Sequence, residues 1–257
     1  MGLVETETRG GAIWIWLNRP DRHNALVPGL VSELRSAIAE AAMAEPVALV
    51  LSGRGSSFST GGDIGGFLDH AGSQATLRAY SDELVGNLHE TILDLLSFPA
   101  PVLAAVNGPV TGGSAGLMLA ADMVAMSGTA FVQPYYNQVG FGPDGGWTAL
   151  LPDRIGTSKA LAIQYRNTRI SASEAVELGL AVCQVPGAEL VATVDGWVVD
   201  LGKGFAQTHR TTRQSVWDAR RCAMVRDRLD QEKARFLDLV SRQSTLDGME
   251  EFTRKRA

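Results

Sequence analysis

The stretch from Pro101 to Asp122 decides the fold of this chain and reads PVLAAVNGPVTGGSAGLMLAAD. Its apolar run from Val102 to Val106, followed by Asn107-Gly108, predicts a short buried strand. Gly112 and Gly113 then predict a turn, and the small apolar residues after them predict the start of a buried helix. Backbone N–H groups at a helix start lack partners within the helix and attract negative charge. The stretch therefore predicts a site for a group that is, or becomes, negative.

Two known loop motifs compete for this turn. Gly108 and Gly113 have the spacing of a phosphate-binding loop, but Ser114 stands where that loop needs its lysine, which excludes it. Residues 112–116 also match G-x-S-x-G, the nucleophile elbow of serine hydrolases. That elbow needs a strand that runs directly into the turn and a later histidine. The only histidine after Ser114 is His209, in a polar run, so a serine hydrolase using Ser114 is the alternative from another enzyme class.

Length and composition are those of one globular domain. The chain has 257 residues, of which 45% are hydrophobic and 20% are charged. A net charge of −5 argues against a nucleic-acid surface, and no apolar run reaches the roughly 18 residues of a membrane span. The N-terminus lacks the apolar segment of a secretory signal. Two cysteines without C-x-x-C spacing and four scattered histidines predict a cytoplasmic protein with no metal site.

The rest of the chain alternates strand and helix patterns, which predicts a parallel sheet with right-handed crossovers. The expected strands are residues 12–17, 47–51, 122–127, 129–131 and 182–185, with 12–17 as the first. The expected helices are residues 30–43 and 73–97, then 190–203, 207–224 and 229–246. Residues 133–147 hold four glycines and two prolines, so no regular element is expected there.

Four motifs in order along the chain resemble the enoyl-CoA hydratase/isomerase (crotonase) superfamily. The glycines of residues 108–116 resemble its second signature, and residues 47–64, ending in Gly62-Asp63-Ile64, resemble its first. Residues 18–26 and 247–255 fit the same family. The resemblance implies an α/β crotonase-like fold with a parallel sheet core of βαβ repeats, residues 1–195. A C-terminal helical segment of the same domain, residues 196–257, would cover coenzyme A and form a homotrimer or a dimer of trimers.

The resemblance also implies an acyl thioester substrate, carried by coenzyme A or an acyl carrier, and no separate cofactor. The thioester oxygen would lie between the N–H groups of Gly62 and Gly113, which stabilise an enolate. Asp144 matches the position where several family Δ3,Δ2-enoyl-CoA isomerases carry a single acid, although its Pro-Asp-Gly-Gly sequence also suits an ordinary turn. Gly116 and Tyr135 replace the two glutamates of family hydratases. This pattern favours an isomerase over a hydratase, and a catalytically silent acyl-CoA binder is the non-enzyme alternative.

Further contacts with the substrate or its coenzyme A are expected around these groups. Phe252 and Lys255 stand three residues apart on a C-terminal helix, so they share a face. The resemblance implies that they hold the nucleotide end of coenzyme A. Asp69 and His70 are candidates for the cover of the acyl pocket, with an exposed loop as their alternative. The complete set of predicted binding residues is Arg22, His23, Thr60, Gly61, Asp63, Ile64, Gly112, Tyr135, Tyr136, Trp147, Phe252 and Lys255.

Overall fold

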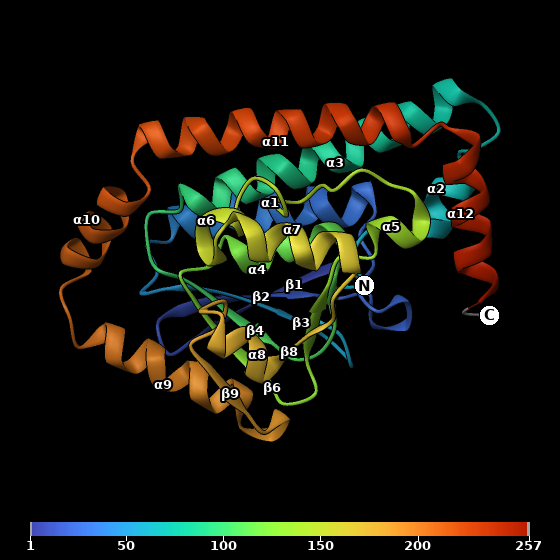
Figure 1. Ribbon diagram of the computed structural model, residues 1–257. Helices are drawn as coiled ribbons and strands as arrows, with labels where there is room; N and C mark the ends of the chain where they lie inside the picture. The colour runs from blue at the N-terminus through green and yellow to red at the C-terminus, as the bar shows by residue number, and fades with distance from the viewer. Residues whose placement is uncertain (1, 256–257) are drawn as a thin grey trace.

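The larger of two sheets forms the centre of the computed structural model, which describes residues 2–255 (Figure 1). Its six strands follow the order β1-β2-β3-β4-β6-β9. All neighbouring pairs are parallel except β1 and β2, which confirms the predicted parallel core. The strands are β1 Val4–Arg9, β2 Ala12–Leu17, β3 Leu49–Gly53, β4 Val102–Val106, β6 Met123–Ser127 and β9 Cys183–Val185.

The amino-terminal end of the sheet differs from the prediction. Residues 12–17 were expected to be the first strand, but β1 precedes them and pairs antiparallel, with Val4 opposite Leu17. Gly10 and Gly11 make the turn with φ of 58° and 87°, a conformation that glycine adopts at little cost. Because β1 has the sequence VETETR, its charged residues concealed a strand, and the two adjacent glycines were the available sign of a hairpin.

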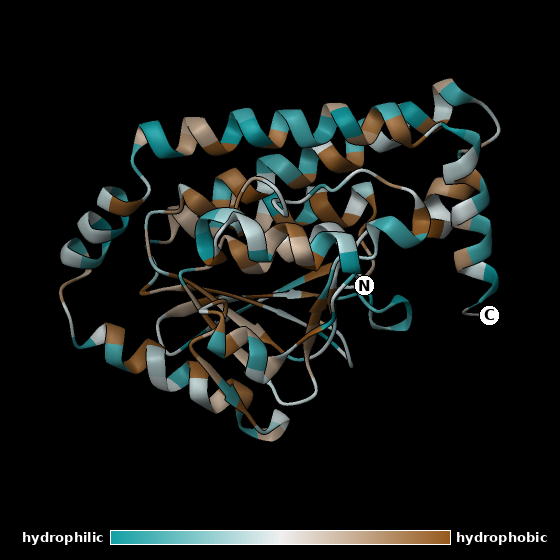
Figure 2. Cartoon of the chain, viewed as in Figure 1, coloured by the Kyte–Doolittle hydropathy of each residue, from teal (hydrophilic) through white to brown (hydrophobic). Residues whose placement is uncertain are grey.

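The two faces of the large sheet pack against different layers. Ile15 and Leu17 of β2 join the core beneath α1 and α3, whereas Trp14 and Trp16 join the core beneath α9, as the two-residue period of a strand requires. Figure 1 shows these layers, with α11 lying along α3, and Figure 2 shows hydrophobic strands inside and hydrophilic residues along the outer side of α11. The long helices are α1 Pro28–Met43, α3 Gln74–Leu96, α9 Leu190–Gly202 and α11 Ala219–Leu239.

A small second sheet positions the turn at Gly112 and Gly113, which directly follows its strand β5. Its strands β5 Val110–Thr111 and β7 Phe131–Gln133 are parallel, and β8 Ile170–Ser171 is antiparallel to β7. A 3-10 turn, η2 Gly112–Ser114, follows β5 and leads into α4 Ala115–Leu119. The remaining elements are η1 Pro20–Arg22, α2 Ile64–Asp69, α5 Tyr136–Val139, α6 Leu151–Ile155, α7 Thr157–Arg166, α8 Ala172–Glu177, η3 Gly187–Glu189, α10 Ala206–Val216 and α12 Gln243–Arg254.

Two predictions about helices were wrong in detail. The expected helices 207–224 and 229–246 have other bounds, because α10 stops at Val216 and Asp218 caps α11 by accepting from Arg221 N at 2.7 Å, whereas the C-terminal helix expected to carry Phe252 is α12. The short α5 also lies in the segment expected to be irregular, between positive-φ residues Tyr135 and Gly140. The division proposed at residue 195 falls inside α9 and stays a prediction.

Residues 2–255 contain neither a candidate membrane-spanning helix nor a candidate metal cluster. None of the helices there combines the length and the apolar character needed to cross a membrane. Within the same residues, histidine, cysteine and acidic side chains do not gather in threes as a metal site.

Candidate active site

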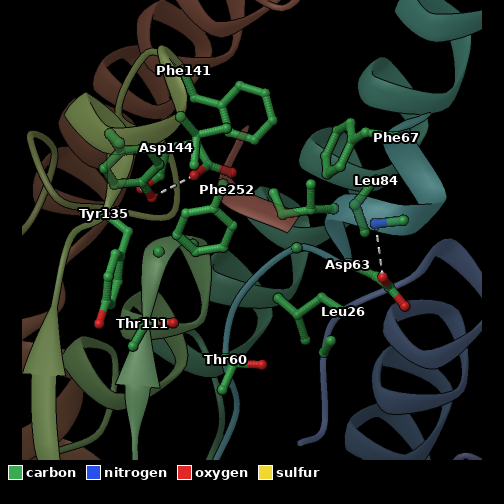
Figure 3. A pocket seen from close by; sticks show the side chains of 18 of the residues that line it. Leu26, Thr60, Asp63, Phe67, Leu84, Thr111, Tyr135, Phe141, Asp144 and Phe252 are labelled. Atoms are coloured by element: carbon green, nitrogen blue, oxygen red, sulfur yellow. Dashed lines mark hydrogen bonds between the residues drawn. The ribbon is translucent and has the colours of Figure 1, made fainter. Parts of the chain in front are cut away.

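A pocket of about 400 Å³ lies where the loops after β3 and β5 meet the helices α3, α11 and α12. Figure 3 shows Asp144 and Tyr135 on one side of it and Asp63 and Phe67 on the opposite side. Twelve of the predicted site residues line it: Arg22, His23, Thr60, Gly62, Asp63, Ile64, Gly112, Gly113, Tyr135, Tyr136, Asp144 and Phe252. The lining does not include three others, Gly61, Trp147 and Lys255.

Two glycine turns contact each other at the base of the pocket. Gly61 has a φ of 76°, and a methyl carbon placed on it would lie 2.5 Å from the carbonyl oxygen of Thr111, so only glycine fits. Leu26 bridges the first turn by bonding to Gly61 O and Asp63 N, at 2.7 and 3.0 Å. Such a bridge uses the groups on either side of Gly62, so the N–H of Gly62 itself points away from Leu26. Both Gly62 and Gly113 border the pocket.

Asp63 holds the first turn in place. Its Oδ1 accepts from Gly65 N at 3.1 Å and caps α2, and its Oδ2 accepts from Arg19 Nη1 at 2.7 Å. Asp63, predicted as a binding residue, therefore also acts as the N-cap of α2. Arg22 Nη2 lies 3.7 Å from the same carboxylate, and the Arg22 side chain is largely exposed at the pocket.

Asp144 lies buried over the second turn. A methyl carbon placed on Gly113 would lie 3.0 Å from its Oδ2. The Tyr136 hydroxyl lies 2.5 Å from Oδ1 and donates to it, and is 2.9 Å from the Asp144 carbonyl. Burial raises the pKa of Asp144 to about 7; the bond from Tyr136 opposes this rise, and the nearby Glu232 charge adds to it. A carboxyl that is half ionised near neutral pH is suited to accept and return a proton.

The positions of the two family glutamates differ in the space available to a side chain. A methyl carbon on Gly116 would lie 2.4 Å from both Gly145 O and Ile92 Cδ1, so this position has no space for a larger side chain. Tyr135 occupies the other position, with a φ of 64°, and lines the pocket. The loop that carries Asp144 thus fills the place where a first hydratase acid would begin.

The sequence did not reveal the groups that hold this loop, residues 144–149, which we call the acid loop. Glu232 of α11 is buried and accepts hydrogen bonds from Gly146, Thr148 and Ala149. His89 of α3 accepts from Gly145 N through Nε2 at 3.2 Å. The available signal for Glu232 was its position in the buried stripe of α11, which otherwise consists of the apolar residues Val225, Leu229, Phe236 and Leu237.

Several predicted binding residues have structural contacts instead. Trp147 is buried, and its Nε1 donates to the carbonyl of Gly112 at 2.7 Å, so it supports the glycine turn from outside the pocket. Lys255 is exposed and pairs with Glu251 at 2.7 Å. Asp69 and His70 are exposed and lie outside the pocket lining, as their alternative role required.

The serine hydrolase alternative finds no support in this geometry. Ser114 Oγ is fully buried, 2.9 Å from the carbonyl oxygen of Ser59 and 2.8 Å from that of Thr111. His209 lines a different pocket, and its Nε2 lies 3.1 Å from the Leu201 carbonyl oxygen. A nucleophile requires an accessible hydroxyl within reach of its base, and Ser114 has neither.

Comparison with known proteins agrees with this fold. The enoyl-CoA hydratase/isomerase family matches residues 7–257, and the chain belongs to that family. YhaR of Bacillus subtilis, named as an enoyl-CoA hydratase/isomerase, is 34% identical over 180 residues, 70% of this chain and 69% of that protein. A Rhodobacter capsulatus protein named as an enoyl-CoA hydratase is 34% identical over 184 residues, 71% of this chain and 68% of that protein.

A solved structure confirms the crotonase fold independently. The enoyl-CoA hydratase from Bacillus halodurans matches with a TM-score of 0.89 over 97% of this chain and 100% of that chain, at 22% identity. Membership of the family implies an acyl-CoA substrate. The choice between hydration and isomerisation rests on the site itself.

Proposed function

We propose that this protein is a Δ3,Δ2-enoyl-CoA isomerase that uses Asp144 as its single acid–base group. The observation that carries the proposal is one buried carboxyl, with its pKa raised to about 7 by burial, lying over Gly113 in the pocket. The absence of space at Gly116 supports it, because hydration by the two-acid mechanism requires a second carboxyl near that position.

The reaction follows from the positions of these groups. The thioester oxygen binds the N–H groups of Gly62 and Gly113, and the Asp144 carboxylate removes a proton from C2 of the 3-enoyl chain. The electron pair of that C–H bond moves onto the thioester oxygen and forms a dienolate, which the two donors stabilise. Protonated Asp144 then returns the proton to C4, and the double bond comes to lie between C2 and C3.

The walls of the pocket favour this reaction over water addition. Phe67, Leu84, Leu88, Phe141 and Phe236 surround the acyl side with apolar surface. An apolar enclosure keeps the proton on the enzyme between its two transfers and strengthens the electrostatic effect of the backbone donors. Arg22 and Phe252 border the same pocket and are our proposed contacts for coenzyme A. Assembly as a homotrimer stays a prediction.

The test is conversion of a 3-enoyl-CoA to the conjugated 2-enoyl-CoA, followed by its absorbance. We expect Asp144→Asn to bind acyl-CoA but to isomerise about 10²–10⁴-fold more slowly, the usual contribution of a general base. Asp69→Asn removes an exposed acid at the end of α2 and serves as the matched control with an unchanged rate. A near-parental rate in Asp144→Asn would refute the acid assignment. Faster hydration than isomerisation would make the protein a hydratase, and binding without turnover a silent binder.

A further inference from the structure

A buried carboxylate outside the pocket organises the acid loop. Glu232 Oε1 accepts from Thr148 N at 2.6 Å, Thr148 Oγ1 at 2.7 Å and Ala149 N at 2.8 Å, and Oε2 accepts from Gly146 N at 2.8 Å. All four partners are donors, so the loop fits the ionised form of this carboxyl. Burial raises the pKa of Glu232, and the bonds from the loop oppose that rise.

No cation contacts this carboxylate in the described part of the chain. His89 Nε2 lies 3.8 Å from Glu232 Oε2, but burial lowers the pKa of His89 to about 4, so the ring is neutral near pH 7. The next residue, Lys233, pairs with Asp82 at 3.2 Å. The titratable groups that face Asp144 are thus Tyr136 from α5 and Glu232 from α11, with His89 of α3 bonded to the adjacent Gly145.

We propose that Glu232 is a positioning residue: its carboxylate fixes the acid loop over Gly113, and its charge makes Asp144 a stronger base. The inference rests on the proposed function. Four hydrogen bonds from Gly146, Thr148 and Ala149 attach the loop to α11, while Tyr136 and His89 bond to its first residues, 144 and 145. A like charge nearby disfavours ionisation of Asp144 and so increases its affinity for a proton.

Two variants separate the charge of Glu232 from its reach. Glu232→Gln keeps the length but removes the charge, so we expect the titration midpoint of Asp144 to fall by about one unit. Above about pH 8, where Asp144 is ionised in both proteins, the weaker base should lower kcat by up to about tenfold, with KM unchanged. Glu232→Asp keeps the charge but is one methylene shorter, so it should reduce kcat while leaving the midpoint near that of the parent. The midpoint is read directly by carboxyl ¹³C NMR, with the Asp144 signal assigned by its loss in Asp144→Asn.

The control is Asp230→Asn, which removes an exposed acid two residues away on the same helix and should change neither quantity. Equal midpoints in Glu232→Gln and the parent, or equal shifts in both Glu232 variants, would overturn the inference. A shifted midpoint in a protein without isomerase activity would retain the coupling and refute the proposed function instead. If neither Glu232 variant folds, Thr148→Val removes one donor and should lower kcat a few-fold at constant KM; an unchanged kcat would overturn the inference.

Discussion

The two glycine turns of the pocket have similar backbones but different neighbours. In each turn a glycine with positive φ, Gly61 at 76° or Gly112 at 54°, precedes the glycine proposed to donate to the thioester. A methyl carbon on Gly62 would first meet the Phe67 ring, at 2.9 Å. The same carbon on Gly113 would meet both oxygens of the Asp144 carboxylate, at 3.0 and 3.1 Å, and Leu88 at 2.9 Å.

This difference suggests that the first turn holds the substrate and that the second turn, beside Asp144, takes part in the reaction. The first turn continues into α2, and Asp63 and Arg19 are committed to keeping it in place. The second turn lies under the acid loop, and Trp147 of that loop bonds to Gly112. Because the Asp144 carboxylate lies where a side chain on Gly113 would stand, a larger residue at Gly113 also displaces the proposed base.

The largest expected effect is therefore a difference in kcat between Gly113→Ala and Gly62→Ala, the same substitution made in each turn. Neither Gly62 nor Gly113 has a positive φ, so alanine at either position tests space rather than backbone conformation. We expect Gly113→Ala to lower kcat about 10²–10³-fold, the scale of losing an oxyanion donor, because it displaces Asp144. Gly62→Ala should cost about tenfold or less, since an aromatic ring at a pocket wall can shift. Equal losses in the two variants would contradict the comparison.

The second prediction concerns stability and its dependence on pH. The folded-state pKa of Asp144 is raised from 3.8 to about 7, mainly by burial, so folding is weakened as pH rises between these values. Asp144→Asn removes that cost and should stabilise the protein by about 2–4 kcal/mol at pH 8, with little difference near pH 4. Thermal or urea unfolding of both proteins at the two pH values measures it. A constant difference across this range would show that Asp144 is not the titrating group.

A smaller effect is expected at the hydroxyl that bonds to the acid. Tyr136→Phe removes a donor to ionised Asp144, so the pKa of that carboxyl should rise. A rise of about one unit would lower the ionised fraction at pH 7 about fivefold, and would therefore lower the rate at this pH by up to about fivefold, because the remaining carboxylate is a stronger base. The pH–rate midpoint should move upward, opposite to the shift expected for Glu232→Gln. A downward shift would mean that the acid loop has opened to solvent.

The same two turns show how much of the site the sequence could predict. Gly61, Gly112 and Asp144 stand in short patterns of consecutive residues, so local turn chemistry and the family motifs located them. Glu232 and His89 reach the acid loop from 86 and 56 residues away, and no local pattern encodes such contacts. An acid inside an apolar helix stripe is nevertheless a visible anomaly, because buried carboxylates require partners.

The smallest effects are expected at the C-terminal end of the pocket. Of the two residues predicted there to contact coenzyme A, only Phe252 lines the pocket. Phe252 lines the pocket with its ring 5.8 Å from that of Tyr135, whereas the exposed Lys255 pairs with Glu251, an interaction worth only about 0.2–1 kcal/mol. Phe252→Ala should raise KM for acyl-CoA about threefold through the loss of part of its apolar contact, and Lys255→Ala no more than about twofold. The Lys255 effect should vanish with a short pantetheine thioester, which lacks the phosphates that an ammonium would meet. Kinetics of both variants with both substrates tests this, and an equal effect of Lys255→Ala on the two substrates would exclude a contact with the nucleotide.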